Sequence, residues 1–327
     1  MIRTPLCDLL GVEHPIFLAG MGGVSYSDVT AAVSEAGGFG CLGAAGMRHE
    51  EMVREIRAVR AKTEKPFGVD LLTASPRDQT AMVATICAEG AKVFVAGLGV
   101  PAKVVDLCHR HGVLVINMCG KVSHALRAVE AGCDIVVAQG TEAGGHTGQV
   151  ATMPLVPMIV DAVNVPVLAA GGIFDGRGLV AALALGAQGI WMGTRFIASA
   201  EARAHPLYKE KILDIDESGT VVTRCYSGKT MRAIRTRYTD EWDTKRDELQ
   251  PFPMQALRAT QDGVWRTLVG PHVGLDPERD CMPAGQSSGG ITAVKPCSAI
   301  IADIVRQAEE VLSELPRPAS GVAAAGR

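Results

Sequence analysis

Short apolar runs alternate with amphipathic segments along most of the chain. The runs have the length of β-strands and end at glycines or polar residues. They occupy residues 15–19, 39–42, 67–72, 165–170 and 190–192, and three more begin near Val93, Leu114 and Ile135. Among the intervening segments, residues 50–62 carry an apolar face on a charged background, formed by Met52, Val53, Ile56 and Val59. The pattern predicts eight strands that alternate with helices.

Glycines mark the ends of several predicted helices, and an apolar strand follows each of them closely. These glycines are Gly37, Gly90, Gly112, Gly132 and Gly186. Glycine is favoured just after a helix because it enters the left-handed backbone region at little cost. Eight strand–helix units predict an α/β fold, a (β/α)8 TIM barrel. An open doubly wound sheet is the alternative, although no G-x-G-x-x-G sequence follows the first strand.

The pattern changes after the eighth strand. Residues 205–284 are more charged and contain most of the tyrosines, together with Trp242 and Trp265. We interpret them as a small, mainly helical insertion that forms a lid. The barrel is then predicted to comprise residues 1–204 and 285–315, with a last helix at about 298–315. Residues 316–327 are predicted to be a disordered tail.

Composition restricts the partners and the location. The formal net charge of −3 is small and no basic patch occurs, so we expect no nucleic-acid binding. The nine cysteines are scattered without a C-x-x-C pair, which favours reduced thiols in a cytoplasmic protein. The chain shows no signal-type segment, and glycines interrupt its longest uncharged stretch, so we expect no membrane span. No histidine pair has metal-ligand spacing, so we expect no metal.

A histidine in a glycine-rich loop is the main candidate for chemistry. The sequence VVAQGTEAGGHTG, residues 136–148, begins as a buried strand, passes Gln139 and reaches His146 between glycines. Glycines allow tight turns and remove side chains that would bury the imidazole. A histidine at the end of a strand suits acid–base chemistry near neutral pH. We therefore predict that His146 is catalytic, the alternative being a glycine-rich loop with an exposed histidine.

Two glycine turns follow the last two predicted strands. Gly171 and Gly172 come after the strand at 165–170, and Gly193 and Thr194 come after the strand at 190–192. In barrels, the loops after the seventh and eighth strands often bind a phosphate through backbone N–H groups. Glycine lets the main chain approach the phosphate oxygens, and Thr194 could donate a further hydrogen bond. We predict a phosphate-binding site here rather than two turns of purely structural role.

Several motifs together resemble one family. AGM near Gly20, PFGVDLL near Pro66, EAGGHTG, LAAGGIFDGRG, MGTRF and AHPLYKEKIL resemble the flavin-dependent nitronate monooxygenases, formerly called 2-nitropropane dioxygenases. The resemblance extends from Leu6 to about Leu315. The flavin-dependent enoyl-acyl-carrier-protein reductases share the EAGGH loop. The resemblance therefore specifies the fold and the cofactor, FMN, more closely than the reaction.

The resemblance also implies roles for individual residues. Gly20, Met21 and Gly22 would lie against the isoalloxazine ring, Gln139 would reach the flavin, and Gly144 and Gly145 would belong to the same binding loop. The turns Gly171–Gly172 and Gly193–Thr194 would bind the phosphate, and His146 would be the catalytic histidine. Asp70 departs from the family, which usually has asparagine there. An ionised carboxylate only accepts hydrogen bonds, so Asp70 either turns away, is protonated or alters the redox preference.

Two reactions follow as alternatives. In the first, FMN oxidises an alkyl nitronate, or a nitroalkane, with O2 to a carbonyl compound and nitrite, and His146 serves as general base or substrate anchor. In the second, NAD(P)H reduces the flavin, which then reduces an enoyl thioester or a quinone. A flavin-binding barrel without activity is a third reading. The sequence is compatible with a homodimer but does not determine the oligomeric state.

Overall fold

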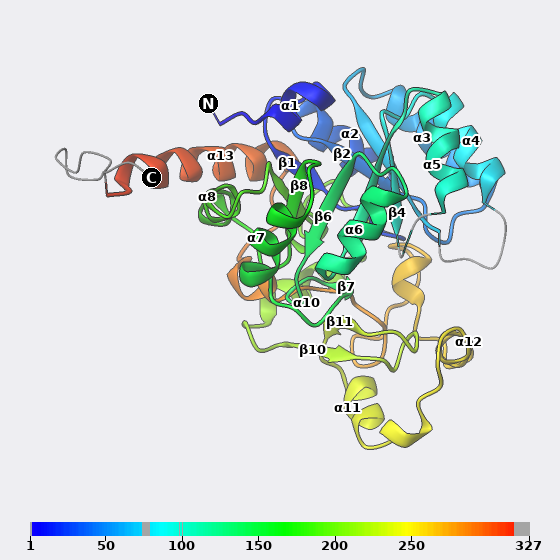
Figure 1. Ribbon diagram of the computed structural model, residues 1–327. Helices are drawn as coiled ribbons and strands as arrows, with labels where there is room; N and C mark the ends of the chain where they lie inside the picture. The colour runs from blue at the N-terminus through cyan, green and yellow to red at the C-terminus, as the bar shows by residue number, and fades with distance from the viewer. Residues whose placement is uncertain (1, 74–78, 98, 100, 317–327) are drawn as a thin grey trace.

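Eight parallel strands form a closed barrel in the computed structural model, which describes residues 2–73, 79–97, 99 and 101–316 (Figure 1). The strands are β1 (Ile16–Leu18), β2 (Gly40–Gly43), β3 (Phe67–Leu72), β4 (Val93–Gly97), β5 (Leu114–Cys119), β6 (Ile135–Gln139), β8 (Val167–Ala170) and β9 (Ile190–Met192). They pair in the order β1-β9-β8-β6-β5-β4-β3-β2, and a parallel bridge between Phe17 and Phe39 closes the ring. The predicted TIM barrel is confirmed, with all eight strands where the apolar runs lie.

The barrel interior is packed with side chains that alternate along the strands. In β4, Val93 and Val95 belong to the inner cluster, whereas Phe94 packs in the outer layer beneath the helices. This alternation follows from the two-residue period of a strand. A short N-terminal helix, α1 (Pro5–Leu10), adds Leu6 and Leu10 to the inner cluster. The sequence analysis did not predict α1.

Helices surround the barrel, one after nearly every strand. They are α2 (Ser27–Glu35), α3 (His49–Arg60), α4 (Thr80–Ala88), α5 (Ala102–Arg110), α6 (Val122–Glu130), α7 (Thr152–Ala162), α8 (Gly176–Ala184) and, after the insertion, α13 (Cys297–Glu314). The predicted helix-ending glycines all have positive φ, for example +86° at Gly37 and +95° at Gly132. The last helix returns to the barrel as predicted and packs on α8, where Gly176 allows the backbones to approach closely (Figure 1).

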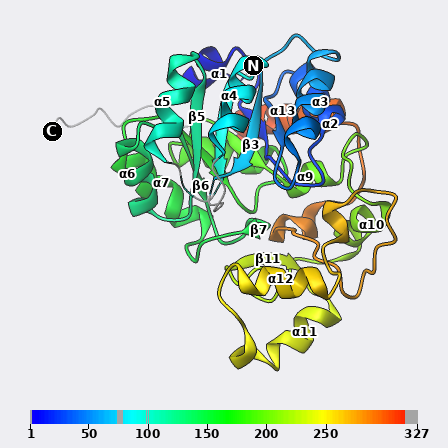
Figure 2. The same ribbon diagram turned by 90° about the vertical axis from the view of Figure 1, so that its right-hand side faces the viewer.

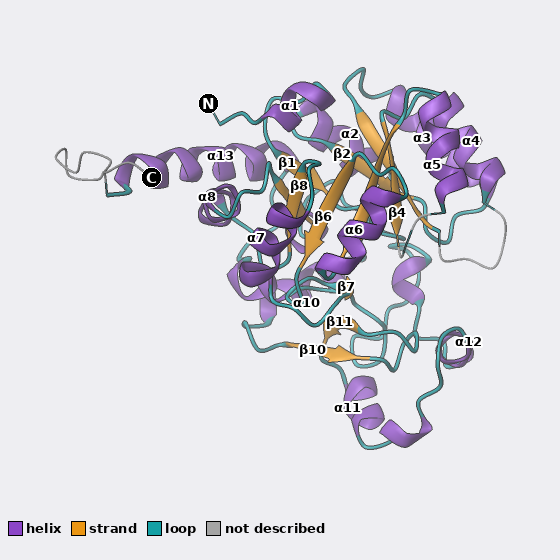
Figure 3. Cartoon of the chain, in the orientation of Figure 1, coloured by secondary structure: helices purple, strands orange, loops and turns teal. Residues whose placement is uncertain are grey.

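The insertion lies over the carboxyl ends of the strands (Figures 1 and 2). After the short α9 (Thr194–Ile197) it contains α10 (Pro206–Asp214), α11 (Arg237–Asp243), α12 (Met254–Gln261) and the 3-10 helices η1 (Arg246–Glu248) and η2 (Arg266–Leu268), with η3 (Gln286–Gly290) following. As predicted, helix predominates. The structure adds an antiparallel pair, β10 (Thr220–Thr223) and β11 (Met231–Ile234), that the sequence analysis missed (Figure 3). The insertion has an apolar cluster separate from those of the barrel, and this cluster includes Tyr226, Tyr238 and Trp242.

Two further expectations concern membrane-spanning helices and the C-terminal tail. No helix in the described part of the chain is long and apolar enough to cross a membrane. The predicted tail at 316–327 lies, apart from Pro316, outside the described residues. His205 caps α10, because its Nδ1 atom accepts a hydrogen bond from the Leu207 N–H at 3.1 Å.

Candidate active site

The carboxyl ends of the strands surround a cavity of about 510 Å³. Each predicted site residue lines it: Gly20, Met21, Gly22, Asp70, Gln139, Gly144, Gly145, His146, Gly171, Gly172, Gly193 and Thr194. These residues follow or end strands that are distant in sequence, and the barrel brings them together because its strands are parallel. The volume is in the range of about 300–1,000 Å³ that is typical of small-molecule sites.

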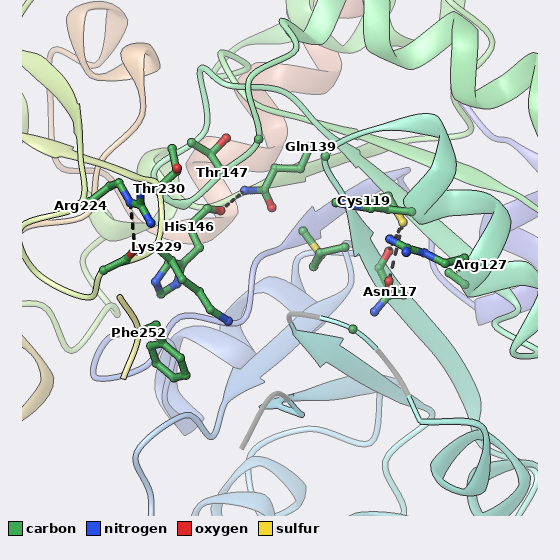
Figure 4. Close-up of a pocket in the computed structure, with 17 residues that line it drawn as sticks. Asn117, Cys119, Arg127, Gln139, His146, Thr147, Arg224, Lys229, Thr230 and Phe252 are labelled. Atoms are coloured by element: carbon green, nitrogen blue, oxygen red, sulfur yellow. Dashed lines mark hydrogen bonds between the residues drawn. The ribbon is translucent and has the colours of Figure 1, made fainter. Parts of the chain in front are cut away.

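A small sheet holds His146 at the cavity wall. His146 and Gly145 form the short strand β7 (Gly145–His146), which pairs with Met231 and Arg232 of β11 in the insertion. The backbone carbonyl of His146 accepts a hydrogen bond from Gln139 Nε2 at 2.6 Å (Figure 4). The glycine-rich loop is thus fixed by strand pairing, and His146 is half-buried, so the alternative of an exposed histidine does not hold.

Within the described part of the chain, the imidazole of His146 has one side-chain partner, and its low pKa makes it neutral at pH 7. Its Nε2 atom lies 2.9 Å from the hydroxyl oxygen of Ser227. Burial, followed by the positive charge of Lys229, lowers the pKa of His146 to about 4. A neutral imidazole has one N–H donor and one acceptor nitrogen, so it can both donate and accept a hydrogen bond.

Asp70 lies in β3 with its carboxyl group at the cavity. Burial raises the pKa of Asp70 to about 8. Its side chain packs directly against Gly20, where a Cβ atom would overlap the carboxyl group. Among the described residues, no side chain makes a hydrogen bond or ion pair with this carboxyl group. Of the three expectations, the structure therefore supports a protonated Asp70, which can donate a hydrogen bond as an asparagine amide does.

The two glycine turns have the backbone geometry that the sequence suggested. Gly171 and Gly172 have φ values of +106° and +74°, which side-chain-bearing residues rarely adopt. Gly193 and Thr194 follow β9, and the Thr194 hydroxyl oxygen accepts a hydrogen bond from the Gly285 N–H at 2.9 Å. That contact leaves the hydroxyl hydrogen of Thr194 free to donate into the cavity.

Residues from the insertion complete the cavity, and the sequence analysis did not identify them. Ser227 lies in the turn between β10 and β11, and Tyr208, Trp265 and Leu268 line the cavity from other parts of the insertion. Tyr208 belongs to the AHPLYKEKIL motif, whereas the other three belong to no motif. For Trp265, the aromatic character of residues 205–284 was the sequence signal.

Comparison with known proteins identifies the family. The model of the nitronate monooxygenase family matches residues 3–82 and 73–307. The chain belongs to the nitronate monooxygenase family. The resemblance stated from the sequence is therefore confirmed, and the protein is an oxidoreductase of a flavin-dependent family that acts on small molecules.

Proteins similar to this chain are named for different reactions. The structure of FabK from Thermotoga maritima has a TM-score of 0.88 and 40% identity, covering 96% of this chain and 99% of that chain. A 5-hydroxy-7a-methyl-1-oxo-octahydro-1H-indene-4-carboxyl-CoA dehydrogenase of Mycobacterium tuberculosis is 39% identical over 74% of this chain and 69% of its own length. A probable nitronate monooxygenase of Staphylococcus aureus is 30% identical over 95% and 98%.

Proposed function

We propose that the enzyme binds FMN in the 510 Å³ cavity and oxidises alkyl nitronates with O2 to a carbonyl compound and nitrite. The observation that carries the proposal is the convergence of the two glycine turns, Asp70 and His146 on one cavity at the carboxyl end of the barrel. When bound, FMN supplies the electron transfer and the reaction with O2, and the protein supplies position and electrostatics.

The residues of the cavity fit FMN. Glycines make up three of the four residues in the turns Gly171–Gly172 and Gly193–Thr194, so a phosphate can approach the main chain there, and the Thr194 hydroxyl can donate a further hydrogen bond. Gly20 and Gly22 let the segment after β1 pack closely at the cavity, since a Cβ atom at either position would meet Asp70 or the Ala45 carbonyl. A neutral Asp70 suits a flavin ring because it can donate a hydrogen bond to a carbonyl oxygen.

We assign His146 to the substrate rather than to the cofactor. With a pKa of about 4, the imidazole is a weak base, so an already ionised nitronate fits it better than a neutral nitroalkane. The hydroxyl of Ser227 holds the ring in orientation from Nε2, leaving Nδ1 to face a ligand. Assistance by a general base is typically worth about 10²–10⁴ in rate, so a nitroalkane would depend on His146 more than a nitronate does.

A second candidate is an FMN-dependent NAD(P)H reductase of an enoyl thioester or a quinone. The 40% identity to FabK and the 39% identity to a carboxyl-CoA dehydrogenase favour it, as both exceed the 30% identity to the probable nitronate monooxygenase. His146 would then donate a proton to the substrate or anchor it.

The test separates these reactions in one preparation. The purified protein should show a flavin absorbance spectrum and release nitrite from an alkyl nitronate in air. Under anaerobic conditions, rapid bleaching by NADPH or NADH would favour the reductase instead. The variant His146→Asn should keep FMN and lose nitroalkane turnover more than nitronate turnover. Equal rates of the variant and the native enzyme on both substrates would remove His146 from the mechanism.

Location, assembly and domain organisation are part of the same proposal. The nine cysteines are all buried and unpaired, which is consistent with a reducing cytoplasm. We propose that residues 205–284 act as a lid, with residues 1–204 and 285–315 as the barrel. The separate apolar cluster around Tyr226 and Trp242 supports this division. We also propose a homodimer, which hydrodynamic measurement of the mass tests.

A further inference from the structure

A buried arginine of the insertion contacts the loop that carries His146. Arg232 lies in β11, directly after Met231, and pairs with Gly145 in the strand register. Only 7% of its surface is exposed, and among the described residues it forms no ion pair with a carboxylate. Burying an unpaired charge is costly, so an apolar side chain would join these strands more cheaply if packing alone were needed.

The hydrogen bonds of Arg232 join three segments of the chain. Its Nε atom donates to the Thr141 carbonyl at 2.9 Å, near the start of loop 140–148. Its Nη1 atom donates to the hydroxyl oxygen of Thr220 at 3.0 Å, in β10. Because the backbone of Arg232 also pairs with Gly145, this one residue contacts loop 140–148 at two points, the second of them next to His146.

Arg232 itself lies outside the flavin cavity. Met231 lines that cavity, whereas Arg232, the next residue of β11, does not. Successive side chains of a strand point to opposite faces of the sheet, which accounts for the difference. Arg232 therefore acts on a ligand in the cavity only through the residues that it holds.

A second charged side chain holds the loop from the barrel side. The carboxylate of Glu142 accepts hydrogen bonds from the backbone N–H of Thr152 at 3.0 Å and from its hydroxyl at 2.9 Å, at the first residue of α7. Burial lowers the pKa of Arg232, and the negative charge of Glu142 opposes this effect. The loop is thus fixed between α7 of the barrel and β11 of the insertion.

We propose that Arg232 is a positioning residue for His146: by joining the start of loop 140–148 to β11, it holds the imidazole at the cavity wall and at the hydroxyl of Ser227. The inference deepens the proposed function and rests on it only for the role of His146 toward the substrate. Arginine suits the task because its rigid, planar group donates to Thr141 and Thr220 at the same time, whereas lysine has a single ammonium group on a flexible stem.

The first test follows the imidazole itself and needs no substrate. NMR titration of the full-length protein, as purified, gives the pKa of each histidine, and the signal missing from His146→Asn identifies His146 among the eight. Burial, followed by the charge of Lys229, lowers the pKa of His146 to about 4. Asp70, which lines the same cavity from β3, stays neutral up to pH 7 and does not disturb the measurement.

Loss of the arginine should relieve this burial. In Arg232→Met the loop separates from β11 and admits water, so the pKa of His146 should rise by about one pH unit or more towards 6.5. Arg232→Lys keeps one donor and should give a smaller rise in the same direction. Equal pKa values of His146 in the native protein and in both variants would overturn the inference.

The matched control is Arg195→Met. Arg195 is 8% exposed and also donates to backbone carbonyls, those of Ala198 and Ala293 at 2.7 Å, neither of which belongs to loop 140–148 or to the β10–β11 hairpin. Its replacement should leave the pKa of His146 unchanged, and a rise as large as that in Arg232→Met would overturn the inference. Melting temperatures establish that the variants are folded, and Arg232→Lys decides alone if Arg232→Met does not fold.

The second test is a double-mutant cycle on turnover. A residue that acts only through His146 has no effect once the imidazole is gone. Arg232→Met should therefore lower kcat/KM for an alkyl nitronate roughly tenfold in the native enzyme and less than about twofold in His146→Asn, with FMN content unchanged. Losses of equal size in both backgrounds would show that Arg232 supports the fold in general, which refutes a positioning role.

The outcome is separable from that of the proposed function. A protein that releases no nitrite but shows the rise in the pKa of His146 refutes nitronate oxidation and retains the role of Arg232. The cycle is then run on oxidation of NADPH or NADH. A protein that oxidises nitronates without any rise in this pKa retains the proposed function and refutes the role of Arg232.

Discussion

Replacement of Asp70 by asparagine tests the charge state that the structure gives this residue. The pKa of Asp70 is about 8 in the folded protein and 3.8 for the free side chain. Between these values the folded state holds a proton that the unfolded state has lost. Stability therefore falls as the pH rises through this range, by about 1.4 kcal/mol per pH unit, and stops falling above pH 8.

His146 acts in the opposite direction over part of this range. Its pKa is about 4 when folded and 6.5 when free, so the unfolded state holds the extra proton and stability rises with pH between these values. The two effects oppose each other from about pH 4 to 6.5. Between pH 6.5 and 8, Asp70 therefore acts without the opposing effect of His146. A fully buried Asp70 would lower the free energy of unfolding by about 2 kcal/mol over this interval. We expect about 1–2 kcal/mol, because water in the cavity of the cofactor-free protein solvates the carboxylate.

The assay is urea denaturation of the cofactor-free protein at pH 6.5 and pH 8. The native protein should lose about 1–2 kcal/mol of unfolding free energy between them, and Asp70→Asn should lose much less. Asp161→Asn, which removes an exposed carboxylate from α7, should behave as the native protein does. Equal losses in the native protein and Asp70→Asn would refute the assignment of a protonated Asp70.

The same substitution should alter the bound cofactor. Above pH 8 the ionised Asp70 would disfavour negative charge on a reduced ring. In the FMN-loaded enzyme at pH 9, the midpoint potential of Asp70→Asn should then exceed that of the native enzyme by roughly 30 mV. This difference corresponds to about 1.4 kcal/mol of repulsion between the carboxylate and the reduced ring for a two-electron reduction. At pH 6 the two potentials should agree, since both side chains are neutral. A difference in midpoint potential that is the same at all pH values would show that the substitution changes the shape of the site and not its charge.

Three further substitutions probe the cavity. His146→Asn should remove the contribution that offsets the Asp70 loss between pH 4 and 6.5, so by urea denaturation the variant should lose about 2–3 kcal/mol of unfolding free energy across this interval while the native protein changes little, and matching profiles would mean that the imidazole is not buried as described. Gly20→Ala places a methyl group against Asp70, so it should reduce FMN content at a stability cost of about 1–3 kcal/mol, and normal FMN content in spectra would contradict this packing. Ser227→Ala removes the partner of His146 Nε2 and should lower kcat roughly tenfold with little change in KM, whereas a change in KM alone would assign Ser227 to binding.

The sequence by itself determined the barrel and the residues around its mouth. Apolar runs of strand length and helix-ending glycines such as Gly37 are local signals, because period and backbone conformation act within a few residues. The glycines around His146 and the Gly171–Gly172 turn were visible for the same reason. Parallel strands then brought these separate strand ends to one cavity, so serial position alone predicted their proximity.

Only the tertiary structure decided the charge states and the long-range contacts of the site. A carboxylate in the sequence is expected to be ionised, and it is burial in the folded barrel that raises the pKa of Asp70. Ser227 reaches His146 because β11 pairs with β7, across a separation in sequence of 81 residues. Burial and long-range pairing depend on the whole fold, whereas propensity and spacing do not.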